Sequence, residues 1–253
     1  MGKYVVELDK IKTRIPKSIC TFHTELDTYG NYMGFQYVLN DDSINISLSG
    51  KLMATSMELG AITLDNFPNC VKNIFSISGI ELPTYYLLEQ APIFVVHVKQ
   101  DILVDDIPSY YISELREICK ANTDNYDVYK YVDLTYENGF RLIPNSSKHI
   151  ESNEDCGIVL TPKTLKNYRY NIYLKGVELR KFENKEYRKI FDEEFLSQAS
   201  NIIRFELQLR TYEDLRHAFN LSNRPPTLID ILSSQNNPVK NFFEQEIIKC
   251  KGE

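Results

Sequence analysis

Polar and apolar residues alternate with a period of two in three segments of the chain, and this alternation predicts β-strands. In the segment 168–178, one parity carries Arg169, Asn171, Tyr173 and Lys175. In the segment 201–210, one parity carries Arg204, Glu206, Gln208 and Arg210. In the segment 94–105, one parity carries His97, Lys99, Asp101 and Asp105. If these strands lie side by side with their apolar faces on one core, the opposite face gathers a tyrosine, carboxylates and cations, which we interpret as a candidate active surface.

Other patterns along the chain complete the predicted secondary structure. Further strands are expected at 3–8, 34–39, 44–48, 128–136, 140–143 and 157–161. The dipeptide Asn138-Gly139 accepts positive φ and indicates a hairpin turn. Helices are expected at 65–78, capped by Asp65 and ended by Gly79, and at 108–118, 183–198, 212–219, 227–232 and 238–249.

This order of elements predicts an α+β fold with a mainly antiparallel sheet flanked by helices and a helical C-terminal end. No repeat, low-complexity tract or linker interrupts the chain. We therefore expect one domain over residues 1–253, with N-terminal strands in 1–60, the sheet core in 61–220 and C-terminal helices in 221–253.

Length and composition argue against a protein that depends on disulfides, spans a membrane or carries a signal peptide. With 253 residues, 43% of them hydrophobic and 25% charged, the chain buries an ample core without disulfides. No run of eighteen apolar residues predicts a transmembrane helix, and the first five residues lack the apolar core of a signal peptide. The odd, scattered set of cysteines fits reduced thiols in the cytoplasm: Cys20, Cys70, Cys119, Cys156 and Cys250.

The net charge of −6 is unevenly distributed along the chain. Residues 1–160 contain 13 Lys and Arg against 22 Asp and Glu, a balance of −9. Residues 161–216 contain 12 against 9, a balance of +3. A local basic groove on an acidic protein and an ordinary mixed solvated surface both account for this distribution.

Familiar nucleotide-binding, serine-hydrolase and zinc-protease motifs do not occur in the sequence. The histidines lack metal-ligand spacing, which argues against a histidine-built metal site: His23, His97, His149 and His217. Three carboxylates remain of interest, namely Asp101, Glu178 and Glu206. Carboxylate oxygens suit Mg²⁺ or Mn²⁺, but a cross-strand salt-bridge ladder with Arg204, Arg210 or Lys175 accounts for the same pattern.

Three short motifs together resemble the rolling-circle replication initiators of plasmids and phages, including the plasmid Rep family and the gene II/gene X type. The first is Ile172-Tyr173-Leu174-Lys175-Gly176-Val177-Glu178, which is similar to the family's I-Y-x-K-x-x-E segment. The second, an R-x-E strand, lies at 203–210, and the third runs from Lys99 to Asp105. The resemblance covers roughly residues 48–235 and implies an HUH-like, Rep nickase-type core.

The resemblance also implies a role for each matching residue. Tyr173 would attack a DNA phosphate with Lys175 beside that phosphate, and Asp101, Glu178 and Glu206 would hold Mg²⁺ or Mn²⁺. DNA would contact the cations Arg169, Lys99, Arg204 and Arg210. Two features depart from the family pattern: Lys99 replaces the usual arginine, whose bidentate contacts a lysine cannot reproduce, and the chain is short at its C-terminus.

We therefore expect a metal-dependent nicking and joining enzyme in the cytoplasm of a bacterial host, acting on single-stranded or cruciform origin DNA. A host helicase and a second copy of the chain are the further partners that the resemblance implies, and no membrane is expected. A DNA-binding or regulatory protein with the same fold but no catalysis is the alternative. A third hypothesis is an interaction protein whose acidic face binds a basic partner.

Overall fold

The computed structural model describes residues 5–120, 126–133, 140–144, 155–164, 168–221 and 224–242. Contacts between Cα atoms divide the chain into two compact units. The first unit comprises Met1–Val98 and Leu209–Pro238, and the second comprises Lys99–Gln208 and Val239–Glu253. The predicted single domain over 1–253 stays a prediction.

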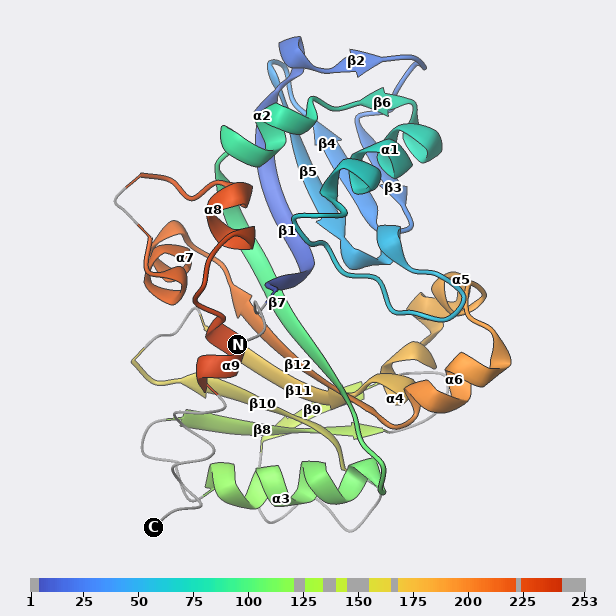
Figure 1. The fold of residues 1–253 in the computed structure, drawn as a ribbon, viewed down its shortest axis with the longest axis vertical. Helices are drawn as coiled ribbons and strands as arrows, with labels where there is room; N and C mark the ends of the chain where they lie inside the picture. The colour runs from blue at the N-terminus through green and yellow to red at the C-terminus, as the bar shows by residue number, and fades with distance from the viewer. Residues whose placement is uncertain are drawn as a thin grey trace. The chain divides into compact units, whose positions relative to one another are not determined.

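The first unit contains a sheet with the strand order β3-β4-β5-β1-β7 (Figure 1). Its β1–β5, β4–β5 and β3–β4 pairs are antiparallel. The strands are β1 (Glu7–Pro16), β3 (Tyr29–Tyr32), β4 (Phe35–Leu39), β5 (Ser43–Ser49) and the start of β7 (Ile93–Leu103), with a separate pair of β2 (Thr21–Phe22) and β6 (Ile80–Glu81). The helices are α1 (Phe67–Ser78), α2 (Thr84–Glu89), α7 (Tyr212–Phe219) and α8 (Leu228–Leu232), with 3₁₀ turns at Lys17–Ile19 and Gly50–Met53.

Helix α1 shows how the sequence determines the elements of the first unit. Its buried residues recur with the helical period: Phe67, Cys70, Val71, Ile74 and Ser78. Gly79 ends the helix with φ 69°, in the left-handed region that glycine adopts at little cost. The predicted stop at Gly79 is therefore confirmed, whereas Asn66 and not Asp65 occupies the N-cap position.

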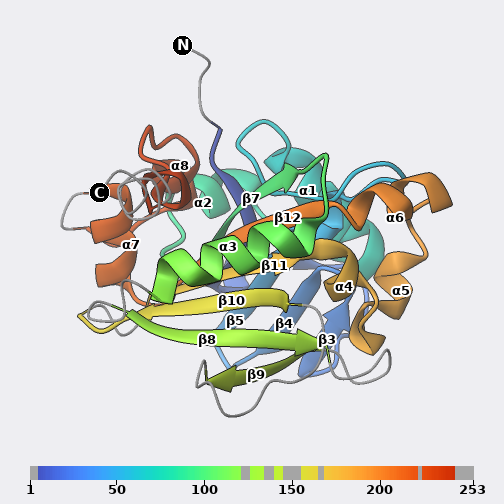
Figure 2. The same ribbon diagram turned by 90° about the horizontal axis from the view of Figure 1, so that it is seen from below.

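The second unit contains a sheet with the strand order β7-β12-β11-β10-β8-β9 (Figure 1). Its β11–β12, β10–β11, β8–β10 and β8–β9 pairs are antiparallel. The strands are β8 (Tyr126–Asp133), β9 (Phe140–Pro144), β10 (Asp155–Pro162), β11 (Arg169–Leu174), β12 (Ile202–Leu209) and the end of β7. Figure 2 shows α3 (Pro108–Lys120) across the sheet, where it contacts β10, β11 and β8.

The remaining helices of the second unit follow the strand that carries Tyr173. They are α4 (Lys175–Leu179), a 3₁₀ turn at Phe182–Asn184, α5 (Lys185–Arg188) and α6 (Glu193–Ala199), followed later by α9 (Pro238–Phe242). Helix α4 packs against α5 and α6. Both units combine antiparallel strands with helices, so the predicted α+β class is confirmed.

Several predicted boundaries are wrong. The first strand begins at Glu7 and extends to Pro16, beyond the predicted 3–8. The predicted helix at 183–198 is broken into three short helical pieces, and Asp192 caps the last of them by accepting a hydrogen bond from the Phe195 amide at 2.7 Å. Lys175 lies at the start of α4 and not on the strand face, because the chain turns into a helix directly after Leu174. The predicted Asn138-Gly139 turn lies outside the described residues.

Candidate functional site

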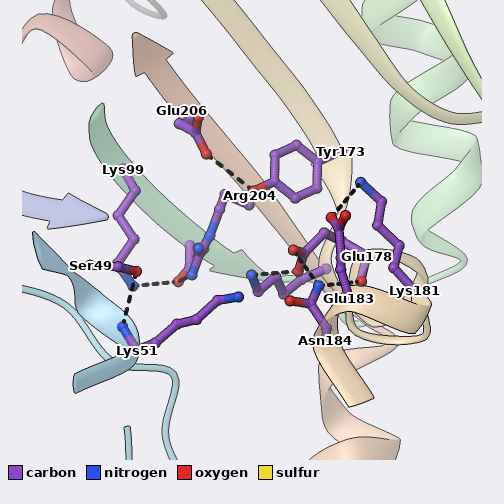
Figure 3. A network of polar contacts seen from close by, with 12 residues as sticks. Ser49, Lys51, Lys99, Tyr173, Glu178, Lys181, Glu183, Asn184, Arg204 and Glu206 are labelled. Atoms are coloured by element: carbon purple, nitrogen blue, oxygen red, sulfur yellow. Dashed lines mark hydrogen bonds and ion pairs between the residues drawn. The ribbon is translucent and has the colours of Figure 1, made fainter. Parts of the chain in front are cut away.

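The polar face of the second unit's sheet is formed by β7, β12 and β11, which lie side by side in that order, as the candidate active surface requires. The β11–β12 register places Tyr173 opposite Arg204, Asn171 opposite Glu206 and Arg169 opposite Gln208. Directly opposite residues on one sheet face have Cβ atoms about 4.5–5.5 Å apart. The strand pairing therefore brings tyrosine, cations and a carboxylate together, as Figure 3 shows.

Asp101 on β7 forms the centre of a buried ion group. Arg204 donates from Nε to Asp101 Oδ1 at 2.6 Å and from Nη2 to Oδ2 at 2.7 Å. Lys99 Nζ donates to the same Oδ2 at 2.8 Å. Both cations are 2% exposed. Burial alone raises the pKa of Asp101, but the charges and hydrogen bonds of Arg204 and Lys99 outweigh it and hold this pKa well below its ordinary value.

Glu178 forms a second ion group at the start of α4. Lys175 Nζ donates to Glu178 Oε2 at 2.7 Å, and Asn184 Nδ2 donates to Oε1 at 2.7 Å and to the Glu178 carbonyl oxygen at 2.8 Å. Lys175 is 3% exposed. Burial raises the pKa of Glu178, whereas Lys175, Arg204 and the Asn184 amide lower it, with a net downward shift. The salt-bridge interpretation therefore describes both Asp101 and Glu178.

Glu206 accepts hydrogen bonds from three neutral side chains. The Tyr173 hydroxyl donates to Oε2 at 3.2 Å, and the Gln208 and Asn171 amides donate to Oε1 at 2.7 Å and 3.4 Å. Glu206 is 7% exposed, and Tyr173 is half-buried. The predicted nucleophile thus points at a carboxylate that can accept its proton (Figure 3).

The arginines and lysine expected to contact DNA differ in exposure. Lys99 and Arg204 are buried against Asp101. Arg169 is half-buried, and its Nε donates to Asn171 Oδ1 at 3.0 Å. Arg210 is exposed and follows β12 in the first unit. Of these four residues, Arg169 and Arg210 offer the more accessible positive charge.

Gly157 was not identified from the sequence, yet it determines how closely β10 approaches Tyr173. It lies directly opposite Tyr173 in the β10–β11 register. A Cβ atom at this position would lie 2.5 Å from the Ile172 carbonyl oxygen and 2.8 Å from Tyr173 Cβ. An isolated glycine within a strand pattern is a sequence signal for such a close approach.

Two further features of the first unit were not predicted. Asp9 on β1 and His97 on β7 bring a carboxylate oxygen and a ring nitrogen within 4.8 Å of each other. A polar cavity of about 760 Å³ lies at the end of α7, with Arg216, His217, Asn220 and Gln235 in its lining. No local pattern in the sequence predicted either feature, because Asp9 and His97 lie on strands that are distant in sequence and the cavity combines α7 with the segment around Gln235.

Hydrogen-bond partners indicate whether a carboxylate can also bind a divalent ion, and this applies to Asp101, Glu178 and Glu206. Carboxylate oxygens are suitable ligands for Mg²⁺ and Mn²⁺. Both oxygens of Asp101 and of Glu178, however, already accept hydrogen bonds, mostly from buried cations. Asp101 and Glu178 as arranged do not fit the ligand role, and the predicted Mg²⁺ or Mn²⁺ requirement stays a prediction.

Comparisons with known proteins add one structural likeness. No protein-family model and no curated protein matches the sequence. A solved structure of a rolling circle replication initiator protein from Geobacillus stearothermophilus matches with 15% identity over 81% of this chain and 73% of that chain, with a TM-score of 0.33.

Within the described residues, no helix has the length and apolar character needed to cross a bilayer.

Proposed function

We propose that this protein nicks and rejoins DNA with Tyr173 as the nucleophile, as an initiator of rolling-circle replication with an HUH-like core would. The observation that carries the proposal is the hydrogen bond from the Tyr173 hydroxyl to Glu206 at 3.2 Å. A nucleophile within hydrogen-bond reach of a base is the arrangement that covalent catalysis requires. The three buried cations Lys99, Lys175 and Arg204 make the surroundings suitable for negative charge.

The reaction transfers a phosphodiester bond from DNA to the protein. The Tyr173 oxygen attacks the phosphorus, its proton passes to Glu206, and the bond between phosphorus and the 3′-oxygen breaks. The 3′-oxygen takes a proton from solvent, which leaves a free 3′-hydroxyl and a 5′-phosphotyrosine link. Because one phosphate ester replaces another, attack by the 3′-hydroxyl restores the DNA strand and the free tyrosine.

The other residues of the polar face have supporting roles in this proposal. A free tyrosine has a pKa of about 10, so its attack as a phenolate needs nearby positive charge. Lys175 begins the helix directly after the Tyr173 strand and supplies such a charge near the phosphate. Arg169 and Arg210 are the cations we assign to the DNA backbone. A divalent ion would add further neutralising charge, but no step above depends on one.

Single-stranded DNA with a label at its 3′ end tests the proposal. Because the tyrosine retains the 5′-phosphate fragment, a 3′-labelled pool of random-sequence oligonucleotides should leave label covalently attached to the protein. The reaction is run with Mg²⁺, with Mn²⁺ and with EDTA, which also tests the predicted cofactor. Tyr173→Phe should abolish the labelled band in a denaturing gel.

Two matched variants control for general effects of removing a tyrosine hydroxyl. Tyr170→Phe changes a residue on the same strand whose ring stacks on Phe242 at 3.8 Å, and Tyr168→Phe changes a buried neighbour. Both should retain the adduct. An adduct that survives Tyr173→Phe and disappears with either control would move the nucleophile to that residue.

DNA binding without catalysis is the second candidate function. The complete pairing of Asp101 and Glu178 favours it, because such a network also suits a purely structural polar core. Salt-dependent binding of the same oligonucleotide pool to the protein, with no adduct under any of the three conditions, would support this alternative.

A further inference from the structure

Five ionised side chains of the second unit form an ordered group of alternating charge. Lys99 contacts Asp101, and Asp101 contacts Arg204. The charge of Arg204 also acts on Glu178, which in turn contacts Lys175. Three positive charges and two negative charges leave the group with a net charge of +1. We call these five residues the charge ladder.

Every oxygen atom of the two carboxylates in the charge ladder already accepts at least one hydrogen bond. Asp101 receives a two-pronged hydrogen bond from Arg204 and a third bond from Lys99. Glu178 receives one bond at each oxygen, from Lys175 and from Asn184. A metal ion at Asp101 or at Oε2 of Glu178 would compete with a buried cation for the same oxygen, and at Oε1 of Glu178 it would compete with the Asn184 amide. Breaking a buried pair in this way is strongly unfavourable, since it leaves an uncompensated charge.

Strand pairing and chain connectivity both place the charge ladder beside Tyr173. Arg204 is the direct cross-strand partner of Tyr173 (Figure 3). Lys175 follows Tyr173 by two residues and donates to Glu178, which Asn184 in turn holds in place. Fixed positive charge near the point where an oxyanion develops accelerates a reaction, because it needs no reorganisation when the charge appears.

We propose that Asp101 and Glu178 are positioning residues that hold Arg204 and Lys175 beside Tyr173, and that neither carboxylate ligates a metal ion. This inference rests on the proposed role of Tyr173 and assigns the two carboxylates differently from the family resemblance. The positive charge that the resemblance assigns to a metal at these two residues is supplied here by arginine and lysine.

Binding of Mn²⁺ tests the metal half of the inference without any DNA. The full chain is titrated with Mn²⁺ and the free ion is followed by electron paramagnetic resonance. Asp101→Asn and Glu178→Gln should bind Mn²⁺ as the unaltered protein does, and absence of binding to all three proteins agrees equally with the inference. A loss of affinity of about 10-fold or more, which is seen even for residues that only support a metal ligand, would overturn it.

Asp230→Asn is a matched control for the Mn²⁺ measurement. Asp230 also contacts an arginine, Arg224, at 2.6 Å, but it lies in the first unit and caps α8. The control shows whether the loss of any Asp–Arg pair changes Mn²⁺ binding. A decrease in Mn²⁺ affinity specific to Asp101→Asn or Glu178→Gln counts against the inference.

A paired substitution tests the positioning half of the inference. Asp101→Asn should slow formation of the DNA adduct by about 10-fold or more, the size seen for residues that orient a catalytic group. Asp101→Asn combined with Arg204→Met removes one charge of each sign and keeps the net charge of the ladder. This double variant should regain thermal stability relative to Asp101→Asn, but its adduct formation should stay slow because the charge of Arg204 is missing.

The outcomes of the paired substitution separate positioning from a structural role. If adduct formation recovers together with the melting temperature, Arg204 is only structural and the positioning claim is overturned. If Asp101→Asn does not fold, the double variant is compared with the unaltered protein instead. Full adduct formation by the double variant then overturns the positioning claim. If the unaltered protein forms no adduct, the proposed function fails, while the Mn²⁺ titration still decides the ligand question.

Discussion

The two units of the molecule differ in the charged side chains that they bury. In the first unit the sheet core is mainly apolar, with Ile11, Ile44 and Leu48 almost fully buried, and its one buried charged residue among those described is Asp214. Asp214 lies in the first turn of α7 and accepts a hydrogen bond from Thr211 at 2.6 Å, a position where a carboxylate stabilises a helix. In the second unit Lys99, Lys175, Arg204 and Glu206 are all buried.

Helix capping does not account for the buried charges of the second unit. Arg204, Glu206 and Lys99 lie on strands, where apolar side chains would form a core at lower cost in desolvation. The first unit demonstrates that this chain can build such a core. The comparison indicates that the second unit keeps its buried charges for a reason other than stability, which is the role we propose for the face around Tyr173.

The largest expected effect on stability is that of Asp101→Asn. This change leaves Arg204 and Lys99 uncompensated, and removal of one partner from a buried pair costs about 3–5 kcal/mol. Urea unfolding, followed by circular dichroism, measures the loss. A change near zero would show that the second unit's pairs resemble surface pairs, and the contrast between the two units would disappear.

The second largest effect expected is the loss of stability when acid protonates the carboxylates of the second unit's ion groups. The pKa of Asp101 and of Glu178 is lower in the folded protein than in the unfolded chain, so their stabilising contribution is fully present above the ordinary carboxyl pKa. The contribution is lost as the pH falls from about 4 through the lower folded-state values. The free energy of unfolding should therefore decrease below about pH 4.

Asp101→Asn is the control for the acid measurement, because it removes one of the two titrating groups. Its free energy of unfolding should depend less steeply on pH over the same range. An unchanged slope would mean that carboxylates elsewhere in the chain dominate acid unfolding.

Gly157→Ala should have an intermediate effect on stability and a specific effect on Tyr173. The added methyl group collides with backbone and Cβ atoms of β11, and overpacking of this kind costs about 1–3 kcal/mol. Adduct formation should fall as well, because Tyr173 is displaced relative to Glu206. Gly30→Ala is the matched control, since the atoms nearest to its methyl group belong to the Tyr37 ring in the first unit, and adduct formation by that variant should persist.

The smallest expected effect is that of Asp42→Asn in the first unit. Asp42 is 3.6 Å from Arg14, and the two side chains are 86% and 57% exposed. Exposed pairs contribute about 0–1 kcal/mol, because solvent screens them and the side chains lose entropy on pairing. Urea unfolding should place this variant within about 1 kcal/mol of the unaltered protein, and a loss comparable with that of Asp101→Asn would contradict the comparison.

Strands and helices with a strong local pattern could be predicted from the sequence. The expected helix at 212–219 is α7, and the alternation at 94–105 and 201–210 corresponds to β7 and β12. The charged segment at 183–198 is predicted as one helix but forms three short pieces, and the side chain of Asp192 caps the last of them as a new helix. Position 175 was assigned to a strand because its parity agreed with that of Tyr173, although the chain had already turned into α4.

Alternation along the chain determined which side chains share a face, since the direction of a strand side chain depends only on its parity. It thereby determined that Tyr173, Glu206, Asp101 and Arg204 belong to polar strand faces. Only the tertiary structure decided the pairing: Asp101 contacts Arg204 across 103 residues of sequence, and Tyr173 reaches Glu206 across 33. Periodicity carries no information about strand order or register, and these two decide whether a carboxylate on one strand meets an arginine or a tyrosine on another strand.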